Sequence, residues 1–344
     1  MDKKSRIKWI DTTKGIAIIL LLLSHSMTKY NVLDNWIFAF HMPIFFIICG
    51  YLTKLKYHNG IKPSQFVNLL TNRWYNLFVP YFLFGTILIL FFNVLKSLSE
   101  TPTNISKPFV DLISMKGIES LWFLPIYFFS ECLLMTIIGS FKEKIRLCII
   151  ITTVALLCMI NQINLSWPCD LIYKVAEGTV FAFMGFIFAT YETEKRITLI
   201  SSVALLVVAS CATLVNQGAS MNDMRFALFY LINAIIISLC IICIIRRLGD
   251  KYGHNRIITF YGRNSLIVLC TNNLVIEICR LIDFKLFNNL IYNLGNIGVF
   301  LFFLIITVLE YPLLKLFEGK FSRQYILSLK GINRVRQNFE HPHN

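Results

Sequence analysis

The chain has 344 residues, of which 56% are hydrophobic and only 15% are charged. A soluble domain carries about 25% charged residues, and one core could not bury so much apolar surface. The net charge of +14 comes from lysines and arginines that cluster in short segments between long apolar runs. That arrangement is typical of membrane proteins and excludes nucleic acid as the expected partner.

The apolar runs predict an all-α fold, a transmembrane helical bundle of about ten spans. Alternate segments between the runs hold 25 of the 33 lysines and arginines, beginning with the segment that contains Lys3 and Lys14. Because basic segments stay on the cytoplasmic side, both chain ends are predicted to be cytoplasmic. In chain order, the predicted spans are residues 15–31, 35–53, 77–97, 119–140, 147–165, 173–191, 197–216, 225–245, 258–280 and 290–314.

The first apolar run is predicted to be retained as a span rather than removed as a signal peptide, because no small-residue cleavage site follows it. Residues 1–319 are predicted to form one membrane domain. Residues 320–344 are predicted to form a basic cytoplasmic tail that lies on the anionic inner leaflet. The longest outer segment, residues 97–119, has the composition of a loop.

The cysteines and histidines do not indicate a disulfide framework or a metal centre. Most of the ten cysteines lie inside apolar runs, and the Cys240-x-x-Cys243 pair is interpreted as small packing residues. The six histidines are too scattered for a zinc site. We therefore expect neither a metal nor a bound cofactor.

Two histidines lie within predicted spans, where ionisable groups are costly and are functional candidates. His25 follows Lys14 by eleven residues, a rise of about 16 Å, and His41 precedes Lys54 by thirteen residues, about 20 Å. A short turn joins the two spans, so we expect both imidazoles at similar depth on neighbouring helices. They could share a proton or bracket a substrate, or they could simply hydrogen-bond the backbone.

The motifs around these histidines resemble the acyltransferase 3 family. The first is Asp11-Thr-Thr-Lys14-Gly, with His25 following, and the second is Phe40-His41-Met-Pro-Ile-Phe-Phe. Weaker similarities extend the resemblance over about residues 6–317: Arg73 through Pro80-Tyr81, Leu121-Trp122-Phe-Leu, Gly262-Arg263-Asn264-Ser265-Leu266 and Glu310-Tyr-Pro.

The resemblance implies an integral membrane O-acyltransferase of a bacterial cytoplasmic (inner) membrane. It would move an acetyl group from cytoplasmic acetyl coenzyme A to a hydroxyl of a surface glycan or its lipid-linked precursor. His25 would act as general base, with His41 as its partner or as a donor on the oxyanion side. A covalent acyl-histidine relay is a variant of this scheme.

Cations at the inner mouth are expected to bind the donor phosphates, and each could instead be a topology anchor. These candidates are Lys14, Arg73 and Arg263. Asp11 and Glu310, placed at inner helix ends, could pair with Lys14 or Arg73 or remain solvated. Trp122 could line the acceptor path or anchor a helix at the interface. Asn264 and Ser265 belong to the supporting set through their motif.

One departure from the family pattern concerns Asn272, which stands where the motif usually has histidine. An amide cannot exchange protons, so only a hydrogen-bonding role is expected there. A second hypothesis is a transporter or flippase for a glycan or small solute. Transporters also place ionisable groups at mid-depth, but they often contain repeated halves, and the sequence shows no internal repeat.

Overall fold

The structure is a computed structural model that describes residues 7–27, 31–57, 63–98, 105–160, 163, 165–221, 223 and 226–318. Within these ranges the regular structure is helical, apart from one isolated β-bridge between Ser220 and Asp223. The predicted all-α class is therefore confirmed. The predicted tail, residues 320–344, lies outside the described residues.

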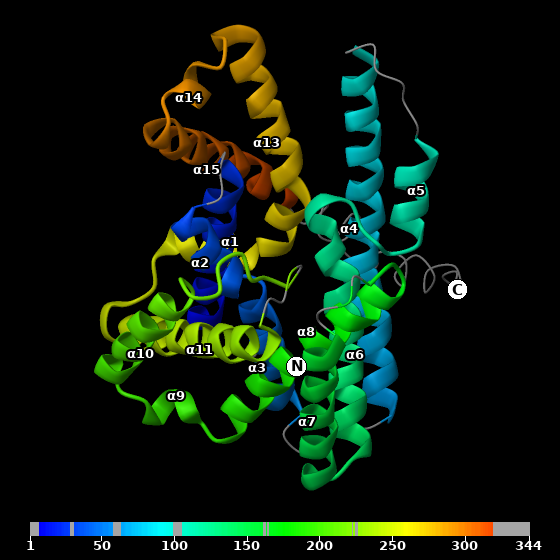
Figure 1. Cartoon of the computed structure of the whole chain (residues 1–344), viewed down its shortest axis with the longest axis vertical. Helices are drawn as coiled ribbons and strands as arrows, with labels where there is room; N and C mark the ends of the chain where they lie inside the picture. Colours follow the sequence, from blue (N-terminus) through cyan, green and yellow to red (C-terminus); the bar gives the residue numbers. More distant parts are fainter. Residues whose placement is uncertain are drawn as a thin grey trace, which may run out of the picture.

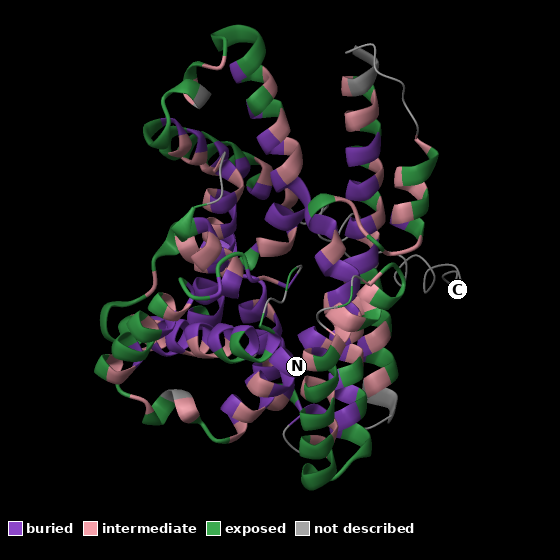
Figure 2. Cartoon of the chain, in the orientation of Figure 1, coloured by how far each residue is buried: buried purple, intermediate pink, exposed green. Residues whose placement is uncertain are grey.

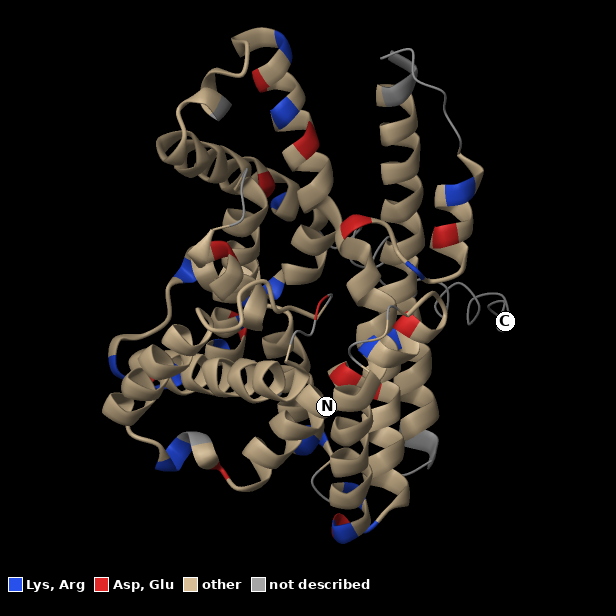
Figure 3. Cartoon of the chain, in the orientation of Figure 1, with Lys and Arg blue, Asp and Glu red and all other residues tan. Residues whose placement is uncertain are grey.

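Seven helical segments of the described chain are long and apolar enough to cross a membrane. Outward-facing apolar side chains support this assignment: Ile297 and Val308 of α15, for example, are 67% and 68% exposed. Figure 3 shows long uncharged stretches in α4, α11 and α15. The seven segments are Val32–Lys56, Phe66–Leu95, Glu119–Ser140, Cys169–Thr190, Ala227–Tyr252, Ser265–Phe287 and Asn296–Phe317.

Three of the ten predicted spans are helices that fall outside this group. α1 (Lys8–Ser26) and α7 (Glu143–Ile160) carry charged residues in their first two turns, and α10 (Leu199–Ala212) is only 14 residues long. The chain is thus a multi-pass membrane protein, and the count of ten spans and the orientation of the termini remain predictions.

Two predicted spans are broken into separate helices. The run 35–53 consists of α2 (Val32–Phe40) and α3 (Pro43–Lys56), which meet at His41 and Met42. Pro43 has no N–H and so takes the first position of a new helix. The run 258–280 consists of α12 (Arg256–Arg263) and α13 (Ser265–Phe287). At their joint the Asn264 amide donates to the Phe260 carbonyl, 3.0 Å away, in competition with the helical backbone.

Other boundaries differ from the predicted runs. α4 (Pro63–Leu98) is 36 residues long, about 54 Å, and begins 14 residues before the predicted span. α11 (Ala227–Tyr252) continues beyond its apolar run through Arg246 and Arg247. The first helix ends at Ser26 rather than at residue 31. The segment predicted as an outer loop contains α5 (Ser106–Ile113).

Figure 1 shows the arrangement of the bundle. α6 (Phe123–Ser140), α7 and α8 (Cys169–Thr190) lie beside the first half of α4, and α13 with α14 (Leu290–Asn293) and α15 (Asn296–Glu318) lies at the opposite end of the molecule. The first three helices lie between these groups. Figure 2 shows that their residues are mostly buried.

Two helix crossings bring backbone against backbone at glycines. α1 crosses α12 where a Cβ on Gly15 would collide with the Ile258 carbonyl and one on Gly262 would collide with the Asp11 carbonyl. α3 crosses α8 in the same way, with Gly50 against Ala182 and Gly185 against Ile47. Small residues allow such close approach between membrane helices. These crossings position the helices that carry both histidines.

Candidate functional site

The two histidines lie at helix ends on either side of one aromatic ring. His25 is in the last turn of α1, and His41 is the residue that follows α2. The Phe38 ring stacks against His25, with centroids 6.5 Å apart, and meets His41 edge to face at 5.1 Å. The structure therefore brings both predicted residues together, although His25 closes its helix rather than lying in the middle of a span.

The orientation of the His41 ring is fixed by its own helix. Nδ1 lies 2.9 Å from the Ile37 carbonyl oxygen, and the residue is 3% exposed. A carbonyl only accepts hydrogen bonds, so Nδ1 carries the hydrogen and Nε2 carries the lone pair in the neutral ring. His41 is thus held as a proton acceptor at Nε2.

Both histidines line one cavity of about 330 Å³, named here the histidine cavity. Its walls come from α1, the α2–α3 joint, the short helix η1 (Glu119–Trp122) and a loop. The cavity brings Trp122 together with His25 and His41. Its lining residues are Leu21, His25, Phe38, His41, Met42, Glu119, Ser120, Trp122, Ser220 and Met221.

A second cavity of about 490 Å³, the carboxylate cavity, shares His25, Phe38 and Glu119 with the first. It adds Asp34, which accepts a hydrogen bond from Ser24, and the ion pair Glu277–Arg280, whose atoms are 2.6 Å apart. Its remaining lining residues are Ser24, Met27, Phe92, Asn273 and Ile276. His25 therefore lies where the two cavities meet.

The Arg280 side chain also holds the end of α1. Its Nη2 donates to the His25 carbonyl oxygen at 3.3 Å. Arg280, which is also paired with Glu277 on its own helix, thus joins α13 to the helix that carries His25.

Asn272 belongs to a buried network beside these cavities. The Ser120 hydroxyl donates to Asn272 Oδ1 at 3.1 Å, and Asn273 Nδ2 donates to the Ser120 hydroxyl oxygen at 2.8 Å. Asn272 is fully buried, and its Nδ2 has no hydrogen-bond partner among the described residues. The expected hydrogen-bonding role fits this geometry.

Arg73 is placed at a different cavity, near the other end of α3. Its Nε lies 2.9 Å from Glu131 Oε2, so its described ionic partner is Glu131 rather than Asp11 or Glu310. The cavity, about 510 Å³, is named the asparagine cavity because Asn68, Asn72 and Asn76 repeat along one face of α4. Its other lining residues are Lys56, Tyr57, Leu69 and Arg73.

Lys14 lies on α1 near this region. Lys14 and Arg73 both interact electrostatically with the buried Cys49 thiol of α3. The same thiol is hydrogen-bonded to the Tyr127 hydroxyl. Arg263 is exposed and lies over the Phe260 ring at 5.9 Å, and Lys315 lies 5.0 Å from the same ring. The asparagine cavity is therefore lined by Arg73, while Lys14 and Arg263 lie outside its walls.

The placement of the two carboxylates differs from the prediction. Glu310 is not at a helix end: it lies within α15, is fully buried and accepts a hydrogen bond from Thr271 at 2.8 Å. Asp11 is in the first turn of α1 but only 5% exposed, because α12 crosses α1 there and Gly262 packs against the Asp11 backbone carbonyl. Solvated interfacial carboxylates are thus the wrong description of both. Asn264 and Ser265 form the α12–α13 joint and line none of the three cavities described above.

Three residues outside the predicted set also line the cavities at His25: Glu119, Glu277 and Arg280. Glu277 and Arg280 fall inside the predicted span 258–280, and ionisable residues inside a span are a usable indication of function. Glu119 lies two positions before Leu121, where the Leu-Trp-Phe-Leu motif begins. Nothing in the local sequence connects it to His25.

Together, the apolar helices and the histidine-lined cavities define an integral membrane protein with a titratable site between its helices. Residues 7–310 match the family model described as an acyltransferase domain. The chain belongs to the acyltransferase 3 family and is a membrane acyltransferase, as the motifs predict. Neither the curated proteins nor the solved structures include a match to the chain.

Proposed function

We propose that the protein is an O-acetyltransferase of a bacterial cytoplasmic (inner) membrane. It takes acetyl from cytoplasmic acetyl coenzyme A and transfers it to a hydroxyl of a surface glycan or of its lipid-linked precursor. The observation that carries the proposal is the joint lining of one cavity by His25 and His41, with the Nε2 lone pair of His41 available. Acyl transfer to a hydroxyl needs such a proton acceptor.

The reaction forms a C–O bond and breaks the thioester C–S bond. A histidine accepts the hydroxyl proton as the oxygen attacks the thioester carbonyl, and the proton leaves with the coenzyme A thiolate. We assign the role of accepting the hydroxyl proton to His25. It lies where the histidine and carboxylate cavities meet, so a sugar substrate in either cavity can reach it. An acyl-histidine relay would use the same cavity.

The geometry changes the role proposed for His41. A ring that donates through Nδ1 to Ile37 presents a lone pair at Nε2, so in the neutral form it cannot donate to an oxyanion from that atom. We therefore propose His41 as a second proton acceptor rather than as an oxyanion donor.

The asparagine cavity is the candidate donor site. Lys56 and Arg73 supply cations for phosphates, and the asparagine amides supply donors and acceptors for a nucleotide. This cavity is at the Lys56 end of α3 and the histidines are at the Pro43 end, about 20 Å away along the helix. A donor bound there would lie at the side predicted to be cytoplasmic, and its acyl group would have to reach the histidines.

Mass spectrometry of surface glycans, with and without the gene, tests this function. We expect loss of the gene to remove one acetyl mass from each substituted hydroxyl, and a His25→Ala gene not to restore it. Glycans with unchanged acetylation in the deletion strain would refute the proposal, whereas a changed distribution of whole glycans across the membrane would favour transport.

A further inference from the structure

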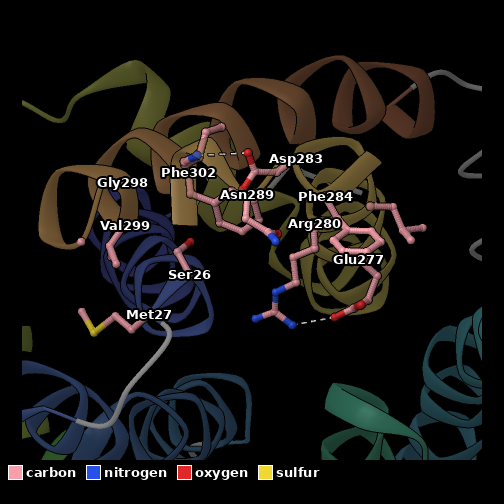
Figure 4. A pocket seen from close by; sticks show the side chains of 13 residues that line it. Ser26, Met27, Glu277, Arg280, Asp283, Phe284, Asn289, Gly298, Val299 and Phe302 are labelled. Atoms are coloured by element: carbon pink, nitrogen blue, oxygen red, sulfur yellow. Dashed lines mark hydrogen bonds and ion pairs between the residues drawn. The ribbon is translucent and has the colours of Figure 1, made fainter. Parts of the chain in front are cut away.

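A fourth cavity, of about 460 Å³, lies beyond the carboxylate cavity and is named the apolar cavity. It is formed by the end of α1, by α13 and by the start of α15 (Figure 4). Most of its surface comes from apolar side chains: Met27, Leu281, Phe284, Ile291, Val299 and Phe302.

Several polar groups at this cavity already have partners within the protein. Asp283 Oδ1 accepts from the Ile291 N–H at 3.1 Å, and the Ser26 hydroxyl donates to the Leu22 carbonyl oxygen at 2.6 Å. Glu277 and Arg280 form their ion pair at one edge, as Figure 4 shows. The free surface is therefore suited to an apolar ligand.

The apolar, carboxylate and histidine cavities adjoin one another in that order. The apolar and carboxylate cavities share Met27, Glu277 and Arg280, and the carboxylate and histidine cavities share His25, Phe38 and Glu119. A molecule extending away from His25 would thus meet first a polar and then an apolar environment.

The chemistry of the carboxylate cavity fits a neutral sugar. Asp34, Glu119 and Glu277 accept hydrogen bonds from hydroxyl groups, and Asn273 can donate or accept. Three carboxylates against the single cation Arg280 disfavour an anionic sugar in this cavity.

We propose that the acceptor is a lipid-linked sugar, with the sugar in the carboxylate cavity and the first part of its apolar chain in the apolar cavity. This inference rests on the proposed function and selects the lipid-linked precursor over the finished glycan. The reacting hydroxyl lies at His25, and the chain extends from the sugar toward Val299 and Phe302.

The test uses native membranes and radiolabelled acetyl coenzyme A, and it separates lipid extract from lipid-free glycan. We expect label first in a saccharide-containing lipid, as an ester released by mild base, and no such label with His25→Ala. Label that appears only in lipid-free glycan would overturn the inference and leave the transferase function intact. Absence of label from both fractions would refute the transferase function itself.

A cavity-filling pair of variants tests the apolar cavity directly. Val299→Trp on α15 should reduce labelling of the lipid by roughly tenfold or more, because forcing extra atoms into an occupied site is costly. Val308→Trp is the matched control, since Val308 is on the same helix and 68% exposed. Equal labelling in both variants would overturn the assignment.

A second pair keeps the test decisive if Val299→Trp does not accumulate. Leu281→Trp fills the same cavity from α13, and its neighbour Ile282, which is 43% exposed, provides the control Ile282→Trp. Leu281→Trp should lose lipid labelling while still binding acetyl coenzyme A, because the asparagine cavity is at the other end of the bundle. Retained labelling with Leu281→Trp would contradict the proposal.

Discussion

At the residue scale, the ring of His41 has one nitrogen engaged by the backbone and one available for chemistry. An orienting partner of this kind selects the tautomer of a histidine and thereby defines which atom is basic. The nearby His25 lacks a described side-chain hydrogen bond of this kind and instead touches two cavities. Because only the His41 ring is oriented by the backbone, the basic nitrogen of each histidine is tested with a different substitution.

His41→Asn tests the basic nitrogen of His41. The asparagine amide can still donate to Ile37 from the position of Nδ1, but it has no lone pair in place of Nε2. We expect acetyl transfer to fall by about 10²–10⁴-fold with the thermal stability nearly unchanged. Near-normal activity of His41→Asn would make His41 a structural residue.

His25→Gln provides the corresponding test at the other histidine. Glutamine retains hydrogen bonding but not basicity, so we expect a loss of about 10²–10⁴-fold, as for His25→Ala. The double variant His25→Ala/His41→Ala should be hardly worse than either single variant, because residues that act as a unit are not additive. If the loss of activity in the double variant equalled the product of the two single losses, the histidines would have independent roles.

The donor site yields a third prediction at this scale. Lys56→Ala should raise the KM for acetyl coenzyme A with little change in kcat, because Lys56 lines the asparagine cavity. Lys54→Ala is the control, since the Lys54 ammonium lies over the Phe186 ring at 5.4 Å and outside that cavity. Lys14 also lies outside that cavity, so Lys14→Ala tests the donor role that the motif resemblance implies: a raised KM would support that role, and an unchanged value would reduce Lys14 to a topology determinant.

At the element scale, close helix crossings determine where the site residues lie. Gly262→Ala should destabilise the protein by about 1–3 kcal/mol, because its new Cβ meets the Asp11 backbone carbonyl, which cannot move without separating α1 from α12. Gly85→Ala is a milder control, because there the Cβ meets only the flexible Leu112 side chain. Thermal unfolding in detergent measures both, and equal midpoints would contradict the proposed crossing.

The pattern of apolar residues predicted which segments are helical better than it predicted where each helix begins and ends. The apolar runs correctly indicated helices, and the helical rise with the short turn between the first two spans correctly predicted that His25 and His41 lie near each other. The breaks at His41 and Asn264 were not predicted, although Pro43 provided a local indication of the first. Asn264 breaks its helix through a side-chain hydrogen bond that hydropathy does not reveal.

Long-range contacts explain the parts of the site that the sequence could not predict. Glu119 and His25 are 94 positions apart, and they line the same cavities only because η1 and α1 each pack beside α13. In the same way, the Arg73–Glu131 pair joins α4 to α6 and differs from the partners expected from charge and position. Such a pairing between residues of distant helices cannot be predicted from a single sequence.

At the scale of the whole molecule, the cavities occupy two ends of the bundle. The asparagine cavity lies at the start of α4, and the apolar cavity lies at the end of α13, at the opposite end of Figure 1. The histidine cavity is connected to the second end through shared walls. This separation suits a donor and an acceptor that approach from opposite sides of a membrane.

Reporter fusions test which end is cytoplasmic. The excess of lysine and arginine in alternate segments predicts that fusions at Lys144 and Asn255 are cytoplasmic and that a fusion at Thr103, which lies outside the described residues, is external. Lys144 is in the first turn of α7 and Asn255 caps α12, so both fusion points lie at helix starts. Because α12 and α13 pack against α1, which lines the same cavities, an external Asn255 would reverse the whole bundle and place the carboxylate and apolar cavities on the cytoplasmic side. The acceptor would then have to be cytoplasmic, and transfer to an external glycan would be refuted.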